Sequence, residues 1–296
     1  MSDLTFSIIL PTFNRSSYLT EAIGSVLKQT YTHWELMIVD DGSVPPVILP
    51  PHLRDERIVL IRQTNAGPSA ARRTGIKRAT GHMLCFLDDD DYYLPDHLAT
   101  LVSMYGGPGA VYCTGTLDDR GDGRWVHTDV LPSGQALTAY WKSPASLLPF
   151  GIPSNIVLTH PFPKDTSPIE DFEWLVTLLA SHPLVAAMSY TTVYRRHDAN
   201  RTNTLIGRRW LRLREDVLYR SYQKPAVQKH VSTTALAVQL THQRLHWVRQ
   251  CLRSNEWKDA SWGLKRSLLH LRPASWKEFA YTLLTGMRAL FTYLQR

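Results

Sequence analysis

Residues 83–91 have the sequence MLCFLDDDD, in which five apolar residues are followed at once by four aspartates. An apolar run of this length after Gly81 predicts a strand that is buried on both faces. Four adjacent carboxylates repel one another, so their ionised forms need solvent or a cation. The stretch therefore predicts a buried strand with a charged site at its carboxyl end.

The same pattern continues on both sides of this stretch. Apolar runs predict further strands at 7–11, 35–39, 58–61 and 110–113, and helical spacing predicts helices at 19–27, at 68–76 and from Pro95. Alternating strands and helices favour a mostly parallel sheet with helices on both faces, which binds ligands beyond the carboxyl ends of its strands. Asp40 and Asp41 follow the strand at 35–39, so they belong to the same binding edge.

The remainder of the chain is less regular and then helical. We expect a helix at 169–181 and a strand at 185–194, followed by long helices after Ile206. Residues 276–294 carry one apolar stripe, which is typical of a helix packed on its own domain or lying in a membrane interface. We place the segment boundaries at 1–105, 106–205 and 206–296.

Composition excludes several classes of protein. The chain has 296 residues, of which 44% are hydrophobic and 20% charged, so wholesale disorder, collagen and coiled coil are excluded. Its three cysteines form no C-x-x-C pair, so we expect neither a disulfide framework nor structural zinc. We expect no signal peptide and no membrane span. Walker, G-x-S-x-G, H-E-x-x-H and G-x-G-x-x-G motifs are absent.

Charge is divided unevenly along the chain. Residues 1–200 hold 15 basic and 21 acidic residues, whereas residues 201–296 hold 18 basic and 5 acidic ones, a net charge of +13. This basic tail is either a solvated surface that uses arginine or a surface that contacts an anionic partner. Its helices are filled with Trp, Leu and Phe and show no recognition motif, so we expect no nucleic acid as a partner.

The aspartate run is suited to a hard divalent cation. Mg²⁺ and Mn²⁺ take oxygen ligands and complete their shell with water and substrate phosphates. Asp88 and Asp90 are the candidates, with a nucleotide diphosphate as the other ligand. The alternative is a solvated acidic turn that caps the helix begun by Pro95, a role open to Asp91 and Asp96.

Four segments together resemble a known family. They are IILPTFNR (8–15), WELMIVDDGS (34–43), NAGPSAAR with GI (65–72 and 75–76), and FLDDDD with Leu94-Pro95 and Leu98 (86–91 onward). In this order and spacing they resemble the inverting, family two glycosyltransferases with the GT-A fold. That fold is Rossmann-like α/β, with a mostly parallel central sheet and helices on both faces. To it this chain adds an α-helical C-terminal extension.

The resemblance implies a role for individual residues of the first half. Pro11 and Thr12 match the loop beside the nucleotide base, and Asp41 matches the aspartate that accepts a hydrogen bond from the pyrimidine ring. Such a carboxylate suits uracil or thymine, which offer a ring N–H. The other matches are Arg72 (base or ribose), Asp88 (ribose), Asp89 (donor site, or simply solvated) and Asp90 (metal). Arg73 stands where many members have Asn, and its role stays open.

The second half supplies the remaining implied groups. Inverting transfer needs a base for the proton of the acceptor hydroxyl. Residues 169–175 resemble the family segment that carries it, which assigns Asp171 as the base with Glu170 as the alternative; both could also merely favour a helix N-terminus. Residues 194–197 resemble the family's Tyr-Arg-x-His segment, which implies that Arg195 contacts the diphosphate and that His197 binds the metal or contacts the diphosphate. The alternative for His197 is a structural role.

The expected function is therefore a Mn²⁺- or Mg²⁺-dependent transfer of a sugar from a nucleotide diphosphate donor, with UDP favoured, to a hydroxyl of a glycan or lipid-linked glycan. We expect the protein to act in cell-surface polysaccharide synthesis and to be cytoplasmic. Through the tail we expect either peripheral contact with an anionic membrane or a homodimer. A non-catalytic sugar or lipid-carrier binding protein and a sugar-phosphate nucleotidyltransferase stay as alternatives. Trp125, Trp141 and Trp174 are candidates for stacking on sugar rings or for the core.

Overall fold

The computed structural model describes two compact units. It covers residues 4–121, 125–128, 130–164, 169–197, 207–254, 256–268, 271–277 and 279–284, without the side chains of residues 16 and 17. The first unit is Met1–Tyr140, Pro144–Thr166 and Glu170–Asp198, and the second is Trp141–Ser143, Ser167–Ile169 and Ala199–Arg296. The second unit therefore includes residues 141–143, 167–169 and 199–205 as well as residues 206–296.

A nine-stranded sheet forms the centre of the first unit. Its strands are β1 (Phe6–Thr12), β2 (Trp34–Asp40), β3 (Ile58–Arg62), β4 (Met83–Phe86), β5 (Tyr92–Tyr93), β6 (Val111–Asp119), β7 (Trp125–His127), β8 (Phe150–Pro153) and β9 (Leu184–Arg195). The order is β3-β2-β1-β4-β8-β6-β9-β5, with β7 paired to β6. The pairs β1–β2, β2–β3, β1–β4 and β6–β9 are parallel, which confirms the expected mostly parallel α/β sheet.

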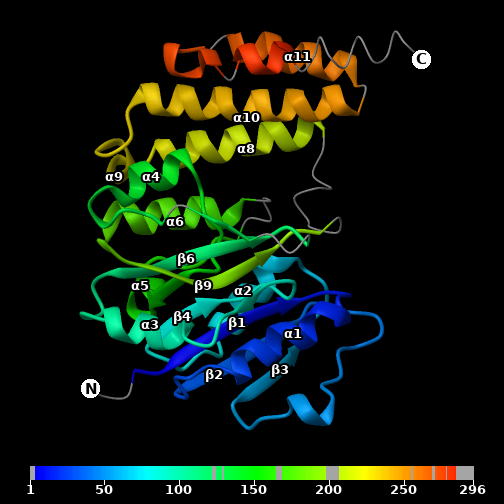
Figure 1. Cartoon of the computed structure of the whole chain (residues 1–296), viewed down its shortest axis with the longest axis vertical. Helices are drawn as coiled ribbons and strands as arrows, with labels where there is room; N and C mark the ends of the chain where they lie inside the picture. The colour runs from blue at the N-terminus through cyan, green and yellow to red at the C-terminus, as the bar shows by residue number, and fades with distance from the viewer. Residues whose placement is uncertain are drawn as a thin grey trace. The chain divides into compact units, whose positions relative to one another are not determined.

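The helices of the first unit cover both faces of this sheet (Figure 1). They are α1 (Ser16–Leu27), α2 (Pro68–Ile76), α3 (His97–Met104), α4 (Ala136–Lys142), α5 (Ser154–Thr159) and α6 (Glu170–Ser181), with short 3-10 turns η1 (Pro51–Leu53) and η2 (Ser133–Gln135). The helix that we expected from Pro95 begins two residues later, at His97. Asp96 is its N-cap residue but makes no side-chain cap bond; its carboxylate accepts a hydrogen bond from Thr30 instead.

Successive side chains of β1 point to opposite faces of the sheet, so both faces contribute to the core. Phe6, Ile8 and Leu10 are fully buried in one cluster with apolar residues of α1 and α3. The intervening Ile9 is also fully buried, and it lies beneath α2. A Cβ atom added at Gly75 of α2 would lie 2.7 Å from Ile9 Cγ2. Gly75 therefore sets how closely α2, and with it Arg72, approaches the sheet.

The second unit is a stack of helices, as Figure 1 shows. It contains α8 (Arg208–Tyr222), α9 (Pro225–Gln228), α10 (Thr233–Arg253), α11 (Trp257–Leu268) and the turn η3 (Pro273–Ser275). Trp247, Val248 and Cys251 of α10 form its core with Leu211 and Ala260. All three cysteines of the chain are free and buried.

A buried ion cluster lies within this helical unit. The carboxylate of Glu215 on α8 pairs with Arg244 of α10, and its Oε2 lies 2.5 Å from Nη2 of Arg266 on α11. Only 2% of the Glu215 side chain and 1% of the Arg244 side chain are exposed. Buried charges are costly unless they are paired, so this cluster fixes the three helices in one arrangement.

The expected apolar stripe of the last segment is only partly buried. In its described residues, Trp276 is 56% exposed and Leu284 55%, whereas Thr282 is 1% exposed. Nη1 of Arg249 on α10 donates a hydrogen bond of 2.8 Å to the Thr282 hydroxyl. Residues 285–294 of the stripe lie outside the described residues. In the described part of the chain, no helix is long and apolar enough to cross a membrane.

The close approach at Gly75 gives a test of stability. We expect Gly75→Ala to lower the free energy of unfolding by about 1–3 kcal/mol, because the new methyl group overlaps a fully buried isoleucine. Gly24 of α1 is the matched control, since nothing lies within 4 Å of an added Cβ there. Gly24→Ala should raise the free energy of unfolding by about 0.5–1 kcal/mol. Urea denaturation measures both, and equal effects of the two substitutions would contradict the tight packing.

Candidate functional site

Three neighbouring parallel strands end at one edge of the sheet and bring acidic groups together there. Thr12, at the end of β1, pairs in register with Asp40 at the end of β2. β4, on the other side of β1, ends at Phe86 and leads directly into the aspartate run. The predicted residues Pro11, Thr12, Asp41 and Asp88 to Asp91 therefore share this edge. The sequence alone placed them there because parallel strands align their carboxyl ends.

Arg15 and His197 converge on Asp90. Nη1 of Arg15 contacts Oδ2 of Asp90 and lies 3.4 Å from Oδ1 of Asp89. Nε2 of His197 lies 3.1 Å from the same Asp90 oxygen. The imidazole also stacks on Tyr18, with the two ring centroids 4.8 Å apart. Asp90 and His197, which the resemblance assigned to a metal, are thus brought together although 107 residues separate them in the chain.

Asp89 is held inside the protein. Its Oδ2 accepts a hydrogen bond of 2.7 Å from the Thr12 hydroxyl, and the residue is 6% exposed. Burial, with a smaller contribution from repulsion by Asp90, raises its pKa to about 7, although the Thr12 bond and Arg15 oppose the change. A solvated role for Asp89 is therefore wrong; its carboxylate joins the end of β1 to the aspartate run.

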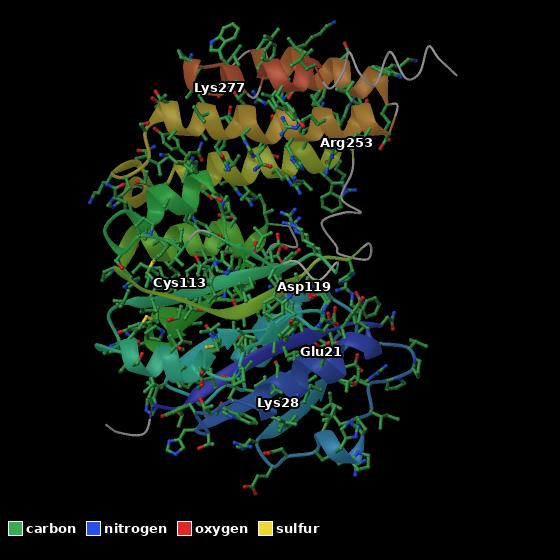
Figure 2. The ribbon with its side chains drawn as sticks, viewed as in Figure 1. Glu21, Lys28, Cys113, Asp119, Arg253 and Lys277 are labelled. Atoms are coloured by element: carbon green, nitrogen blue, oxygen red, sulfur yellow. The ribbon has the colours of Figure 1, made fainter. Side chains whose placement is uncertain are left out.

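Asp91 positions the segment that carries Arg195 and His197. It is 2% exposed, and its Oδ1 accepts a hydrogen bond from the backbone N–H of Arg195. Burial raises the pKa of Asp91 well above its ordinary value. The guanidinium of Arg195 pairs at 2.7 Å with Glu21 of α1, which Figure 2 labels. Asp91 thus anchors the end of β9 rather than capping α3.

Asp41 organises the loop before α2. Its Oδ1 accepts hydrogen bonds from Nε2 of Gln63 and from the backbone N–H of Ala66, and its Oδ2 accepts one from the backbone N–H of Gly67. Gly67 has a φ of 86°, which glycine adopts without strain. A carboxylate has about four acceptor positions, so Asp41 retains one for a further donor such as a pyrimidine N–H.

Arg72 joins the aspartate run to α6. Its Nη2 lies 2.5 Å from Oδ1 of Asp88, and its Nη1 lies 3.3 Å from Oε1 of Glu170. Burial by itself lowers the pKa of this guanidinium, but attraction by Asp88, Glu170 and Asp171 outweighs it and raises the pKa. Arg72 is therefore a permanent cation between two groups of carboxylates. The neighbouring Arg73, whose role the sequence left open, donates a hydrogen bond to the carbonyl of Pro163.

Asp171 lies at the first turn of α6, and its environment changes its pKa. Burial, repulsion by Glu170 and repulsion by Asp88 raise the pKa to about 6, although Arg72 and a hydrogen bond from the backbone N–H of Phe172 oppose this change. A carboxyl with this pKa is ionised at neutral pH and is a stronger base than an ordinary aspartate. Glu170, the alternative base, is 3% exposed and paired with Arg72.

The residues present fit a divalent cation that is completed by substrate. In the described part of the chain, no three His, Cys, Asp or Glu side chains form a ready metal site. Asp90 and His197 nevertheless offer an oxygen and a nitrogen that are 3.1 Å apart and face each other. Mg²⁺ and Mn²⁺ sites of this kind use one or two protein ligands together with phosphate oxygens and water. Asp90 and His197 are therefore too few to complete a metal site by themselves, and a phosphate-bearing ligand would supply the missing oxygen ligands.

The three tryptophans that could stack on sugars lie in different environments. Trp141 and Trp174 are buried, at 1% and 2% exposure, whereas Trp125 is 48% exposed on β7. Trp174 packs edge to face on Phe86, and its indole N–H donates to the carbonyl of His160. The core interpretation therefore holds for Trp141 and Trp174, and Trp125 alone of the three is open to a ligand.

Sequence reasoning missed Arg15. This residue was part of the quoted segment 8–15 but received no role. The asparagine before it is a usable signal in the sequence, because asparagine tolerates a left-handed backbone conformation better than most residues. In the structure, Asn14 has this conformation, with a φ of 54°. Asn14 also accepts a hydrogen bond from the backbone N–H of Val44 through its side chain, and its own backbone N–H donates to Ser43. These bonds fix the loop that places Arg15 on Asp90.

Known proteins are similar in sequence to part of this chain. Over 108 residues the chain is 39% identical to the Escherichia coli UDP-Glc:alpha-D-GlcNAc-diphosphoundecaprenol beta-1,3-glucosyltransferase WfgD, a match that covers 35% of this chain and 42% of that protein. The chain spans between 14% and 42% of the length of the curated relatives that it matches.

Solved structures show the same fold over almost the whole chain. S. aureus TarS (residues 1–349), solved with UDP-GlcNAc, has a TM-score of 0.67 at 15% identity and covers 96% of this chain and 89% of that one. The mannosyltransferase PcManGT from Pyrobaculum calidifontis, solved with GDP-Man and Mn²⁺, has a TM-score of 0.53 at 15% identity, with 97% and 87% covered. The expected GT-A fold is therefore confirmed.

The family model of glycosyl transferase family 2 matches residues 7–160. The match begins in β1 and extends past the aspartate run, Arg72 and β8, so it includes the strand ends on which the site is built. Since it covers more than half of the chain, this protein belongs to the glycosyl transferase family 2.

Proposed function

We propose that this protein is an inverting glycosyltransferase that moves a sugar from a UDP-sugar to a hydroxyl of a glycan or lipid-linked glycan in cell-surface polysaccharide synthesis. The observation that carries the proposal is the bridge made by Arg72. It connects Asp88, at the edge where a nucleotide would bind, to the Glu170–Asp171 pair that would supply the base. A donor site and a basic carboxylate joined by one buried cation suit a displacement between two substrates.

The chemical step follows from the environment of Asp171. The acceptor oxygen attacks the anomeric carbon as the bond from that carbon to the diphosphate oxygen breaks, and Asp171 takes the proton of the hydroxyl. The nucleoside diphosphate leaves with the bonding electrons, and attack opposite to it inverts the configuration. Repulsion by Glu170 and burial make Asp171 more basic, while Arg72 keeps it ionised near neutral pH.

The donor side of the site has two further requirements. The charge that develops on the leaving diphosphate needs a positive partner, which bound Mn²⁺ or Mg²⁺ on Asp90 and His197 would supply. For the nucleotide, the remaining acceptor position of Asp41 favours the ring N–H of uracil. Two related proteins support this choice, since WfgD is named for UDP-Glc and TarS was solved with UDP-GlcNAc.

The helical unit is the part that we assign to membrane contact. Trp276, Tyr281, Leu283 and Leu284 are exposed apolar or aromatic residues of its last described segment. Lys265, Arg272 and Lys277, the last labelled in Figure 2, are exposed cations of the same region. Apolar side chains beside cations suit an anionic bilayer surface, and a lipid-linked acceptor would be reached from there.

Two aspartates should separate donor binding from turnover. Asp90→Asn should weaken calorimetric binding of UDP in Mn²⁺ at least tenfold and remove its dependence on the metal. Asp171→Asn should leave that binding within about twofold but lower UDP release from UDP-glucose or UDP-GlcNAc by at least a hundredfold, because the base is lost. Asp96→Asn and Glu173→Gln are the matched controls, and both should behave as wild type. Wild-type turnover by Asp171→Asn would refute the base assignment.

The pKa of Asp171 predicts how turnover depends on pH. Turnover requires the ionised carboxylate, so kcat should fall by about tenfold from pH 7 to pH 5, one unit below the pKa of about 6. The charged and titratable groups that face Asp171 are Glu170, Asp88, Arg72 and Tyr140. Arg72 lowers the pKa of Asp171, so Arg72→Gln should move the acid limb to higher pH, and Arg72→Lys should move it less. An unmoved or lowered midpoint in Arg72→Gln would rule out this coupling.

Membrane contact is tested by flotation with liposomes. The protein should float with vesicles of phosphatidylglycerol and phosphatidylcholine at low salt and be released at high salt, because screening weakens electrostatic attraction. The double variant Trp276→Ser, Leu284→Ser should float at least fivefold less. Leu158→Ser is the matched control, because Leu158 is 81% exposed on the sheet unit. Failure of the wild type to float, with a dimer seen by light scattering, would assign this surface to a second copy.

A further inference from the structure

Arg15 occupies the oxygen that a metal ion would need. Its Nη1 contacts Oδ2 of Asp90, and His197 Nε2 faces the same oxygen at 3.1 Å. The guanidinium also lies 3.4 Å from Asp89. The carboxylates of Asp89 and Asp90 thus share one side-chain cation.

This contact is specific and firmly held. The Arg15 side chain is 27% exposed, and that of Asp90 is 10% exposed, so solvent screens the pair only in part. The bonds of Asn14 with Ser43 and Val44 fix the backbone directly before Arg15. Arg15 therefore meets Asp90 through a prearranged backbone.

We propose that Arg15 is an internal substitute for the divalent cation, which holds Asp89 and Asp90 together until metal binding displaces its guanidinium. This inference rests on the proposed function, since it takes Asp90 and His197 as the metal-binding pair. A metal ion bound to Asp90 would lie close to the guanidinium on the same carboxylate, and two cations there repel each other. Metal binding and the Arg15–Asp90 pair therefore disfavour each other.

The consequence is a thermodynamic competition. The apparent affinity for the metal is the intrinsic affinity multiplied by the fraction of molecules in which the Arg15–Asp90 pair is broken. Metal alone should then bind weakly, and a nucleotide diphosphate, which adds ligands to the ion, should strengthen its binding. Removing Arg15 should strengthen the binding of the metal alone.

The experiment measures Mn²⁺ binding to the full chain without nucleotide, by the electron paramagnetic resonance signal of the free ion. Arg15→Gln should bind Mn²⁺ about tenfold more tightly than wild type, as expected for loss of a charge-assisted hydrogen bond. Arg15→Lys, whose single ammonium cannot contact both aspartates in the same way, should lie between the two.

Two controls distinguish direct contact between Arg15 and Asp90 from a general effect of positive charge on Mn²⁺ affinity. Arg62→Gln removes one positive charge at the same sheet edge, where Arg62 pairs with Asp40, and should change the Mn²⁺ affinity less than twofold. The tenfold difference should persist in 0.5 M NaCl, where a long-range effect is screened. Loss of the difference in salt, or an equal effect of Arg62→Gln, would overturn the proposal.

Thermal unfolding gives a second readout. In EDTA, Arg15→Gln should melt at a lower temperature than wild type, because Asp89 and Asp90 lose their counter-charge, and saturating Mn²⁺ should restore it. An unchanged or weaker Mn²⁺ affinity in Arg15→Gln, with binding abolished in Asp90→Asn, overturns this inference and leaves the metal site standing. Mn²⁺ binding that survives Asp90→Asn would reject both the metal site and the inference.

Discussion

Repulsion between carboxylates at one sheet edge is the constraint on which the site depends. Parallel pairing of β1, β2 and β4 brings Asp40, Asp41 and the run 88–91 to this edge. These groups have positive partners or N–H donors. Asp40 pairs with Arg62, and Asp41 accepts hydrogen bonds from the loop 63–67. In the run, Asp90 pairs with Arg15, and Asp88 pairs with Arg72. The loops that follow these strands are therefore held in place by the charges that they carry.

Arg72 extends this constraint to the second half of the sheet unit. Removing one partner from a buried ion pair leaves an uncompensated buried charge. The resulting loss of stability is far larger than the stability that an exposed ion pair contributes. The position of α6 is thus coupled to that of Asp88, because Arg72 binds both. The close packing of α2 on the sheet at Gly75 sets the distance of Arg72 from the sheet. One small residue of this helix therefore contributes to the geometry of two carboxylate groups on different elements.

The sequence predicted β1 to β4, β6 and β9, the helices α1, α2, α3 and α6, and the edge at which Asp41, Asp88 and Asp90 lie, because hydrophobic periodicity and parallel pairing determine these. It did not predict the short strands β5, β7 and β8 or the helices α4 and α5. It could not predict the pairs Arg15–Asp90 and Arg72–Glu170, whose partners are 75 and 98 residues apart. Such pairs depend on side-chain direction in the folded chain. The bond from Arg249 to Thr282 is a further example, since it buries a polar residue of the tail.

The four consecutive aspartates show how one residue type acquires four environments. Asp88, 44% exposed at its side chain, faces Arg72; Asp89 is buried against Thr12 with its pKa raised to about 7; Asp90 faces Arg15 and His197; and Asp91 is buried on the backbone of Arg195. Burial that raises the pKa of Asp89 and Asp91 lessens the negative charge held beside Asp90. A cation at Asp90, whether guanidinium or metal, therefore balances fewer charges than the sequence DDDD would indicate.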